Sequence, residues 1–142
     1  MSAETSPAFV DTNILVYAFA EDHPDRHDVA RRLITQLTEA GTLRLSTQVV
    51  QEFFVTVTGK ARKTLSRDEA IRRMDSLSEW LTVATDYAAI RDAAALAGEA
   101  GISFGDALIV VAAARSGATV LYTEDLNHGQ KLLGVTIVNP FK

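Results

Sequence analysis

Cysteine is absent from this chain of 142 residues. The absence excludes a disulfide-stabilised scaffold, a thiolate zinc site and a cysteine nucleophile, and it is compatible with a reducing cytoplasm, where we expect the protein. No apolar run approaches the roughly 18 residues of a transmembrane helix, so we expect no membrane span. The first residues also lack the basic and apolar regions of a signal peptide.

Basic charge is scarce as well. The formal net charge is −4, and this sign excludes a protein that coats nucleic acid indiscriminately. The charge is uneven, because residues 60–73 carry a net charge of +4 and leave −8 for the rest of the chain. This basic segment could hold a phosphate backbone beside an acidic pocket, or it could be an ordinary solvent-exposed surface. Its candidate contacts to such a backbone are Lys60, Arg62, Lys63 and Arg67.

Hydrophobic residues make up 47% of the sequence and charged residues 23%, proportions typical of a folded chain rather than a disordered one. The length corresponds to a single domain. We therefore expect a flexible polar tail over residues 1–6 and one domain over residues 7–142.

Short apolar segments alternate along the chain with longer segments that show helical periodicity and helix-capping residues. The predicted strands cover residues 8–10, 43–45, 81–83, 119–122 and 135–138. The predicted helices cover about residues 12–20, 24–40, 47–62, 66–80, 86–100 and 104–115. Strands that are short, apolar and separated by helices form a mostly parallel sheet covered on both faces. The pattern therefore predicts an α/β fold of three layers.

Acidic residues occupy the places where such a fold binds ligands, beyond the carboxyl ends of parallel strands. Asp11 directly follows the first predicted strand, and Asp125 follows the fourth, with Glu124 beside it. Asp106 lies in the first turn of the last predicted helix. Glu52 lies on the third predicted helix, away from the apolar face and beyond the first turn, where a capping role does not account for it.

Each of these carboxylates also has a purely structural explanation. Asp11 and Asp125 could cap helices, Asp106 could belong to a capping pair with Ser103, and Glu52 could be a surface residue. Their convergence would be costly, because two charges 4 Å apart repel by about 4 kcal/mol at an effective dielectric of 20. A cation removes this cost, and ligands that are all oxygen favour Mg²⁺ or Mn²⁺ over Zn²⁺. Such a site could activate water against a phosphodiester.

Four segments resemble the motifs of PIN domains, in order and at the usual spacing. They are Val-Asp-Thr-Asn-Ile-Leu at 10–15, Val-Gln-Glu-Phe at 50–53, Phe-Gly-Asp-Ala-Leu-Ile at 104–109 and Tyr-Thr-Glu-Asp-Leu at 122–126. The ending Gly-Val-Thr-Ile-Val-Asn-Pro-Phe at 134–141 is similar to one bacterial subgroup of VapC-type toxins. The resemblance spans nearly the whole chain.

This resemblance implies a PIN-like three-layer sandwich and a metal-dependent ribonuclease, the toxin of a type II toxin–antitoxin pair. The family's catalytic and metal-binding residues correspond to Asp11, Glu52, Asp106 and Asp125. Supporting roles fall to Thr12, Asn13 and Thr123. The implied cofactor is Mg²⁺ or Mn²⁺, and the implied partners are an RNA substrate, a cognate antitoxin and a second copy of the chain. Hydrolysis by activated water would leave 5′-phosphate and 3′-hydroxyl ends. Asp125 is favoured over Glu124 because it matches the motif position.

Three other functions remain open on the sequence. A metal-free nuclease could use histidines, of which His23, His27 and His128 are present. A phosphotransfer or phosphatase domain would need a lysine near Asp11, and the only late lysines are Lys131 and Lys142. A PIN fold without activity could serve as an RNA- or protein-binding module.

Overall fold

The computed structural model describes residues 6–60 and 64–142. Within them, six strands form one sheet: β1 (Ala8–Val10), β2 (Leu43–Ser46), β3 (Leu81–Val83), β4 (Val120–Tyr122), β5 (Lys131–Leu132) and β6 (Val135–Val138). The strand order is β3-β2-β1-β4-β6-β5. Every neighbouring pair is parallel except β5 and β6, which are antiparallel. The predicted, mostly parallel sheet is confirmed.

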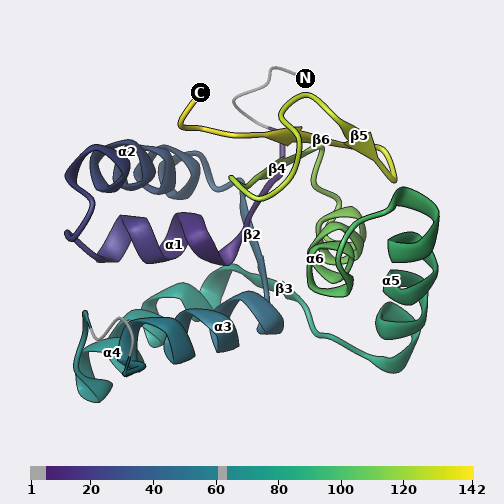
Figure 1. The fold of residues 1–142 in the computed structure, drawn as a ribbon. Helices are drawn as coiled ribbons and strands as arrows, with labels where there is room; N and C mark the ends of the chain where they lie inside the picture. Colours follow the sequence, from purple (N-terminus) through teal and green to yellow (C-terminus); the bar gives the residue numbers. More distant parts are fainter. Residues whose placement is uncertain (1–5, 61–63) are drawn as a thin grey trace.

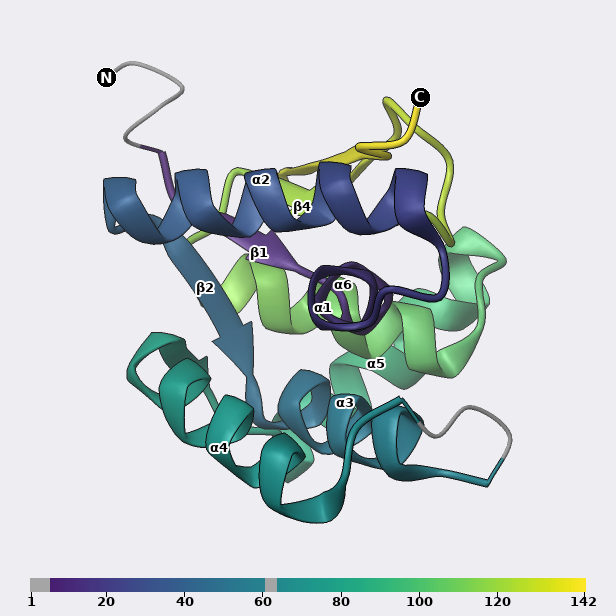
Figure 2. The same ribbon diagram turned by 90° about the vertical axis from the view of Figure 1, so that its left-hand side faces the viewer.

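Helices cover both faces of this sheet. The described residues form α1 (Thr12–Phe19), α2 (Pro24–Ala40), α3 (Thr47–Thr58), α4 (Arg67–Leu77), α5 (Tyr87–Ala100) and α6 (Phe104–Arg115), with a 3₁₀ turn at Ser78–Trp80. Figure 1 shows α1 and α2 on one side of the sheet and α5 and α6 on the other. Figure 2 shows α1 end-on, between α2 and the pair formed by α3 and α4. The arrangement confirms the predicted three-layer α/β fold.

Capping residues set most helix boundaries where the sequence places them. Ser66 and Glu69 form a reciprocal capping box at the start of α4. Gly41 ends α2 in the left-handed conformation, at φ 71°. The prediction that the third helix reaches residue 62 was wrong, since α3 ends at Thr58. Gly59 follows it with extended backbone, and glycine is a poor helix former.

Strand β5 was not predicted from the sequence. This strand has two residues and pairs with β6 through a turn at Leu133 and Gly134, where φ is 50° and 79°. Positive φ at both turn residues is typical of a tight hairpin connection. A two-residue strand is too short to show an alternating pattern. The expected N-terminal tail lies outside the described residues apart from Ser6.

Helix α6 packs against α5 and against the strands β2, β4 and β6. Its residues Ala107 to Ala113 are all buried, which explains why this segment is apolar on every side. Phe9 of β1 and Phe53 of α3 are also fully buried. Within the described residues, no single helix has the length and hydropathy needed to cross a membrane. Helices α5 and α6 meet those requirements only as a pair, and they are bent at 116° to each other.

Candidate functional site

The carboxyl ends of β1 and β4 lie side by side at the point where the chain connections diverge. The sheet extends from β1 to β2 in one direction and from β4 to β6 in the other, and ligands of open α/β sheets bind at such a point. Val10 pairs with Tyr122, which places the next residues, Asp11 and Thr123, beside each other. The Thr123 hydroxyl donates a hydrogen bond of 2.8 Å to Oδ2 of Asp11.

Asp11 is a buried carboxylate at the start of α1. Its side chain is part of a residue that is only 5% exposed, and its Oδ1 accepts a hydrogen bond of 2.7 Å from the backbone N–H of Thr12. Burial raises the pKa of Asp11 from 3.8 to about 7, even though the hydrogen bonds from Thr123 and Thr12 act in the opposite direction. The charges of Asp125 and Glu52 raise this pKa further. The site therefore holds Asp11 in an environment that disfavours its charged form unless a cation is near.

The other three candidate carboxylates line the same pocket, whose volume is about 310 Å³. Glu52 comes from the second turn of α3, Asp106 from the first turn of α6, and Asp125 from the loop after β4. The structure thus brings together all four acidic residues that the motifs identify, from four separate segments of the chain. The remaining lining residues are Thr12, Asn13, Val16, Tyr17, Thr56, Gly105, Ile109 and Glu124.

Asn13 and Thr123 connect the first and last of these carboxylates. The Asn13 amide donates a hydrogen bond of 3.0 Å to Oδ2 of Asp125, and the backbone N–H of Asp125 donates one of 3.1 Å to the Thr123 hydroxyl. Burial raises the pKa of Asp125, and the neighbouring charge of Asp106 raises it further, while the bond from Asn13 lowers it. Oδ1 of Asn13 is buried and has no hydrogen-bond partner within the described residues.

The chemistry of this pocket fits a hard divalent cation. Every charged residue that lines it is a carboxylate, the kind of ligand that Mg²⁺ and Mn²⁺ prefer. Within the described part of the chain, the buried Asn13 oxygen lacks a hydrogen-bond donor or other ligand, and the raised pKa of Asp11 shows that no positive charge offsets its burial. As the side chains are placed, no three acidic or histidine side chains among the described residues lie close enough to hold one ion. The carboxylate side chains would therefore have to move closer together to bind one ion.

Glu124 lines the pocket, and both of its carboxylate oxygens already accept hydrogen bonds. Its Oε1 accepts a hydrogen bond of 2.7 Å from the Tyr17 hydroxyl, and its Oε2 accepts one of 3.1 Å from Nε of Arg26. Sequence reasoning missed Tyr17 and Arg26 as neighbours of the pocket. Both lie on helices that precede the loop by about a hundred residues, so no local signal identified them.

None of the histidines lines the acidic pocket. Nδ1 of His27 lies 2.8 Å from the backbone carbonyl of Tyr17, and His23 packs against the Tyr17 ring. His128 accepts a hydrogen bond from the backbone N–H of Asn139. The described part of the chain also places no lysine in the pocket, so the histidine-based and phosphotransfer alternatives find no support there.

The basic segment does not reach this pocket within the described residues. Lys60 and Arg67 are exposed, and neither lines the pocket. Arg62 and Lys63 lie outside the described residues. Their contact with nucleic acid stays a prediction.

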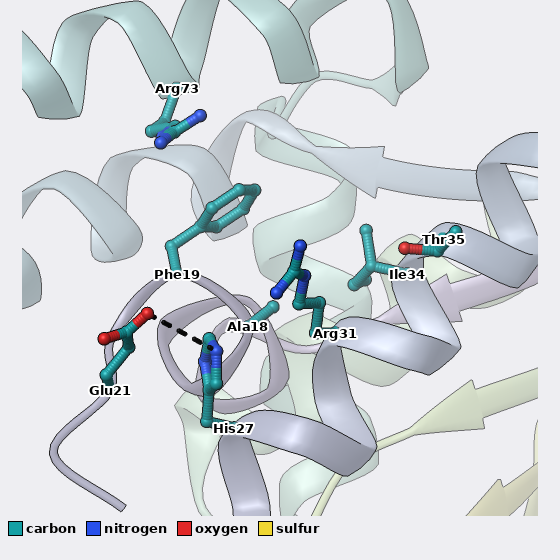
Figure 3. A pocket seen from close by; sticks show the side chains of 8 residues that line it. All are labelled: Ala18, Phe19, Glu21, His27, Arg31, Ile34, Thr35 and Arg73. Atoms are coloured by element: carbon teal, nitrogen blue, oxygen red, sulfur yellow. Dashed lines mark ion pairs between the residues drawn. The ribbon is translucent and has the colours of Figure 1, made fainter. Parts of the chain in front are cut away.

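A second pocket, of about 360 Å³, lies at the C-terminal end of α1 and has a different character. Figure 3 shows Arg31 of α2 and Arg73 of α4 at this pocket, together with an ion pair of 3.9 Å between His27 and Glu21. The Arg73 guanidinium lies 5.4 Å from the centre of the Phe19 ring. None of the four candidate carboxylates lines this pocket, so it is separate from the acidic site.

Comparisons with known proteins give one family and a set of similar folds. A family model of the PIN domain matches residues 8–131. No curated protein matches the sequence. Among solved structures, the chain is similar to VapBC2 from Rickettsia felis bound to a DNA fragment from their promoter, at 18% identity and a TM-score of 0.61, covering 92% of this chain and 96% of that one.

Two further structures share the fold. VapBC from Salmonella typhimurium, solved bound to DNA, is 19% identical with a TM-score of 0.62 and covers 93% of this chain and 96% of that one. VapC20 from Mycobacterium tuberculosis, described as a toxin that cleaves the Sarcin-Ricin loop, is 18% identical with a TM-score of 0.62 and covers 80% of this chain and 86% of that one.

Proposed function

The chain belongs to the PIN domain family, and from this premise we propose that it is a Mg²⁺- or Mn²⁺-dependent endoribonuclease. In this proposal it hydrolyses phosphodiester bonds in RNA and acts as the growth-inhibiting toxin of a type II toxin–antitoxin pair. One observation supports the proposal most strongly. Four carboxylates from distant segments line one pocket at the carboxyl ends of β1 and β4, and they lie in the four segments that resemble the motifs of PIN domains.

The four carboxylates would hold the metal ion, with Asp11 as the most fixed of them. Two hydrogen bonds orient Asp11, whereas Glu52 and Asp125 are more exposed and can adjust to the ion. When bound, Mg²⁺ or Mn²⁺ would lower the pKa of a water molecule and neutralise charge on the phosphodiester. Asp106 lies in the first turn of α6, and its backbone N–H donates a hydrogen bond of 3.1 Å to the hydroxyl of the N-cap residue Ser103.

The neutral polar residues have positioning roles in this proposal. Thr123 orients Asp11 by its hydroxyl and fixes the backbone of Asp125. Asn13 holds Asp125 with its amide N–H and leaves its buried Oδ1 available for a water molecule or cation. The Thr12 hydroxyl lies 3.5 Å from Oε2 of Glu52 and limits where that side chain can point.

The proposed partners follow from the similar folds. The structures from Rickettsia felis and Salmonella typhimurium are VapBC complexes bound to DNA, so we infer that this chain also has a cognate antitoxin. We further expect it to form a homodimer. RNA is inferred to be the substrate, since VapC20 is described as a toxin that cleaves the Sarcin-Ricin loop.

The experiment that tests the proposed function is cleavage of total RNA with Mg²⁺, Mn²⁺ or EDTA, followed by mapping of the ends. We expect metal-dependent cuts with 5′-phosphate and 3′-hydroxyl ends. Asp106→Asn should abolish cleavage, whereas the control Asp75→Asn, an exposed position on α4, should not change it. Cleavage that persists in EDTA, or 2′,3′-cyclic phosphate ends, would refute the chemistry. A properly folded protein that cuts no RNA would indicate a binding module.

A further inference from the structure

A group of arginine and aromatic side chains adjoins the acidic pocket at Glu124. The Arg26 guanidinium, from α2, lies 5.1 Å from the centre of the Phe141 ring and 5.7 Å from that of Tyr17. The two rings meet edge to face, with centres 5.4 Å apart. Glu124 receives a hydrogen bond from both Arg26 and Tyr17. We call these four residues the rim cluster.

The C-terminal residues hold the Phe141 ring in place. The backbone N–H of Phe141 donates a hydrogen bond of 2.9 Å to Oδ1 of Asn139. The backbone N–H of Asn139 in turn donates one of 3.0 Å to Nδ1 of His128. The surface beneath Arg26 is therefore built from α1, the loop after β4 and the C-terminal end, so that the guanidinium is oriented before any ligand arrives.

The engagement of Glu124 separates it from its neighbour Asp125. Both carboxylate oxygens of Glu124 accept hydrogen bonds, from Tyr17 and from Arg26. Asp125 instead accepts a hydrogen bond from the Asn13 amide. Burial raises the pKa of Asp125, and the charges of Asp106 and then Glu124 raise it further. Glu124 thus orients the guanidinium of Arg26, whereas Asp125 belongs with Asp11, Glu52 and Asp106, which we call the acidic set.

The negative charge of the pocket indicates why a basic side chain is needed beside it. Five carboxylates line the pocket, and they repel the phosphates on either side of a bond to be cut. Among the described residues, Arg26 is the only lysine or arginine that hydrogen-bonds to a residue lining this pocket. Its side chain is 47% exposed, and Glu124 takes only one of the five N–H donors of the guanidinium. Planar guanidinium groups bind phosphate oxygens with two donors at once.

We propose that Arg26 is a substrate-contacting residue that binds an RNA phosphate next to the scissile one, and that Glu124 positions Arg26 rather than the metal ion. The inference rests on the proposed ribonuclease function, since it concerns the same site. It goes beyond the motifs, because Arg26 lies in none of them.

The experiment measures binding of a fluorescent single-stranded RNA to Asp106→Asn protein in Mn²⁺ at several salt concentrations, so that cleavage does not interfere. Adding Arg26→Gln should weaken binding about tenfold at physiological salt. It should also reduce the slope of log K against log salt by about 0.7, the value for one lost phosphate contact on a single strand. Arg26→Lys should retain most of the slope but lose part of the affinity. Arg32→Gln, an exposed position on the same helix that pairs with Asp28, is the matched control and should change neither quantity.

Glu124→Gln separates positioning from metal binding. We expect RNA binding to weaken severalfold, while the affinity of the RNA-free protein for Mn²⁺ stays within twofold. A tenfold loss of Mn²⁺ affinity would overturn the assignment, because it would make Glu124 a metal ligand. An Arg26→Gln protein with unchanged RNA affinity and salt slope would also overturn it. If the wild-type protein cleaves no RNA at all, the proposed ribonuclease function fails. The effect of Arg26→Gln on RNA affinity and on the salt slope then still decides whether Arg26 binds an RNA phosphate.

Discussion

The buried carboxylate of Asp11 gives the sharpest prediction, because its charge should destabilise the metal-free protein. The pKa of Asp11 rises from 3.8 to about 7 on folding, chiefly through burial. Each pKa unit corresponds to about 1.4 kcal/mol, so the ionised carboxylate costs up to about 4 kcal/mol at pH 8. Asp11→Asn keeps the shape of the side chain and removes the charge. The variant should therefore be more stable than the wild type when no metal is bound.

The pH dependence of this difference in stability tests the prediction. The folded-state pKa lies above the unfolded one, so the folded wild type binds the proton more tightly and loses stability as the pH rises from about 4 to about 7. Asn at this position does not titrate. The stability of Asp11→Asn relative to the wild type should grow by about 2 to 3 kcal/mol between pH 5 and pH 8 in EDTA. For a chain of this length, that corresponds to roughly 5 to 10 °C in Tm.

The assay is urea unfolding of both proteins in EDTA across this pH range, repeated in Mn²⁺. A bound cation stabilises the ionised wild type but not the variant, so the difference should shrink when Mn²⁺ is added. Cleavage activity should be lost in the variant under all conditions. A stability difference that stays constant from pH 5 to pH 8 in EDTA would refute the reasoning, because it would show that no buried charge is relieved.

Two other side chains give further expectations from their hydrogen bonds. Thr123→Val leaves Oδ2 of Asp11 and the backbone N–H of Asp125 without a partner, so unfolding in urea should show a loss of about 1 to 3 kcal/mol, and a Mn²⁺ titration should show weaker binding. Asp86→Asn should give the opposite pH dependence to Asp11→Asn, because the pKa of Asp86 is lowered by a backbone N–H at the start of α5 and then by Arg115. Its wild-type advantage should be present at neutral pH and disappear as the pH falls below about 4, which thermal unfolding at low salt would detect.

The fold was predictable because its signals are local. Capping residues such as Ser66 and Gly41 mark helix ends by hydrogen bonds within a few residues, and these ends lie where the sequence puts them. The apolar segment that becomes α6 was identified by its length and alanine content, and its burial from all sides was confirmed. The predictions failed where a feature depends on contacts between segments rather than on local signals. The short strand β5 depends on pairing with β6, and no local pattern encodes that pairing.

The acidic site was predictable in its members but not in its geometry. A carboxylate directly after a strand must lie at the carboxyl edge of the sheet, which is why Asp11 and Asp125 could be placed from the sequence. Glu52 and Asp106 came from the motifs, and the structure places both on the pocket. Arg26 and Phe141 could not be placed, because their contacts join segments that are more than a hundred residues apart.

A local hydrogen bond explains why Asp125 and Glu124, although adjacent in sequence, contact different groups. The Thr123 hydroxyl accepts the backbone N–H of Asp125 two residues later, a turn that is encoded in the order threonine, any residue, aspartate. This turn holds Asp125 close to the strand end and to Asn13. Glu124 has the longer side chain, and it reaches Tyr17 and Arg26 instead. Two adjacent carboxylates are thus divided between the acidic set and the rim cluster. Removing the Thr123 hydroxyl should therefore disturb metal binding more than exchanging Glu124 for glutamine does.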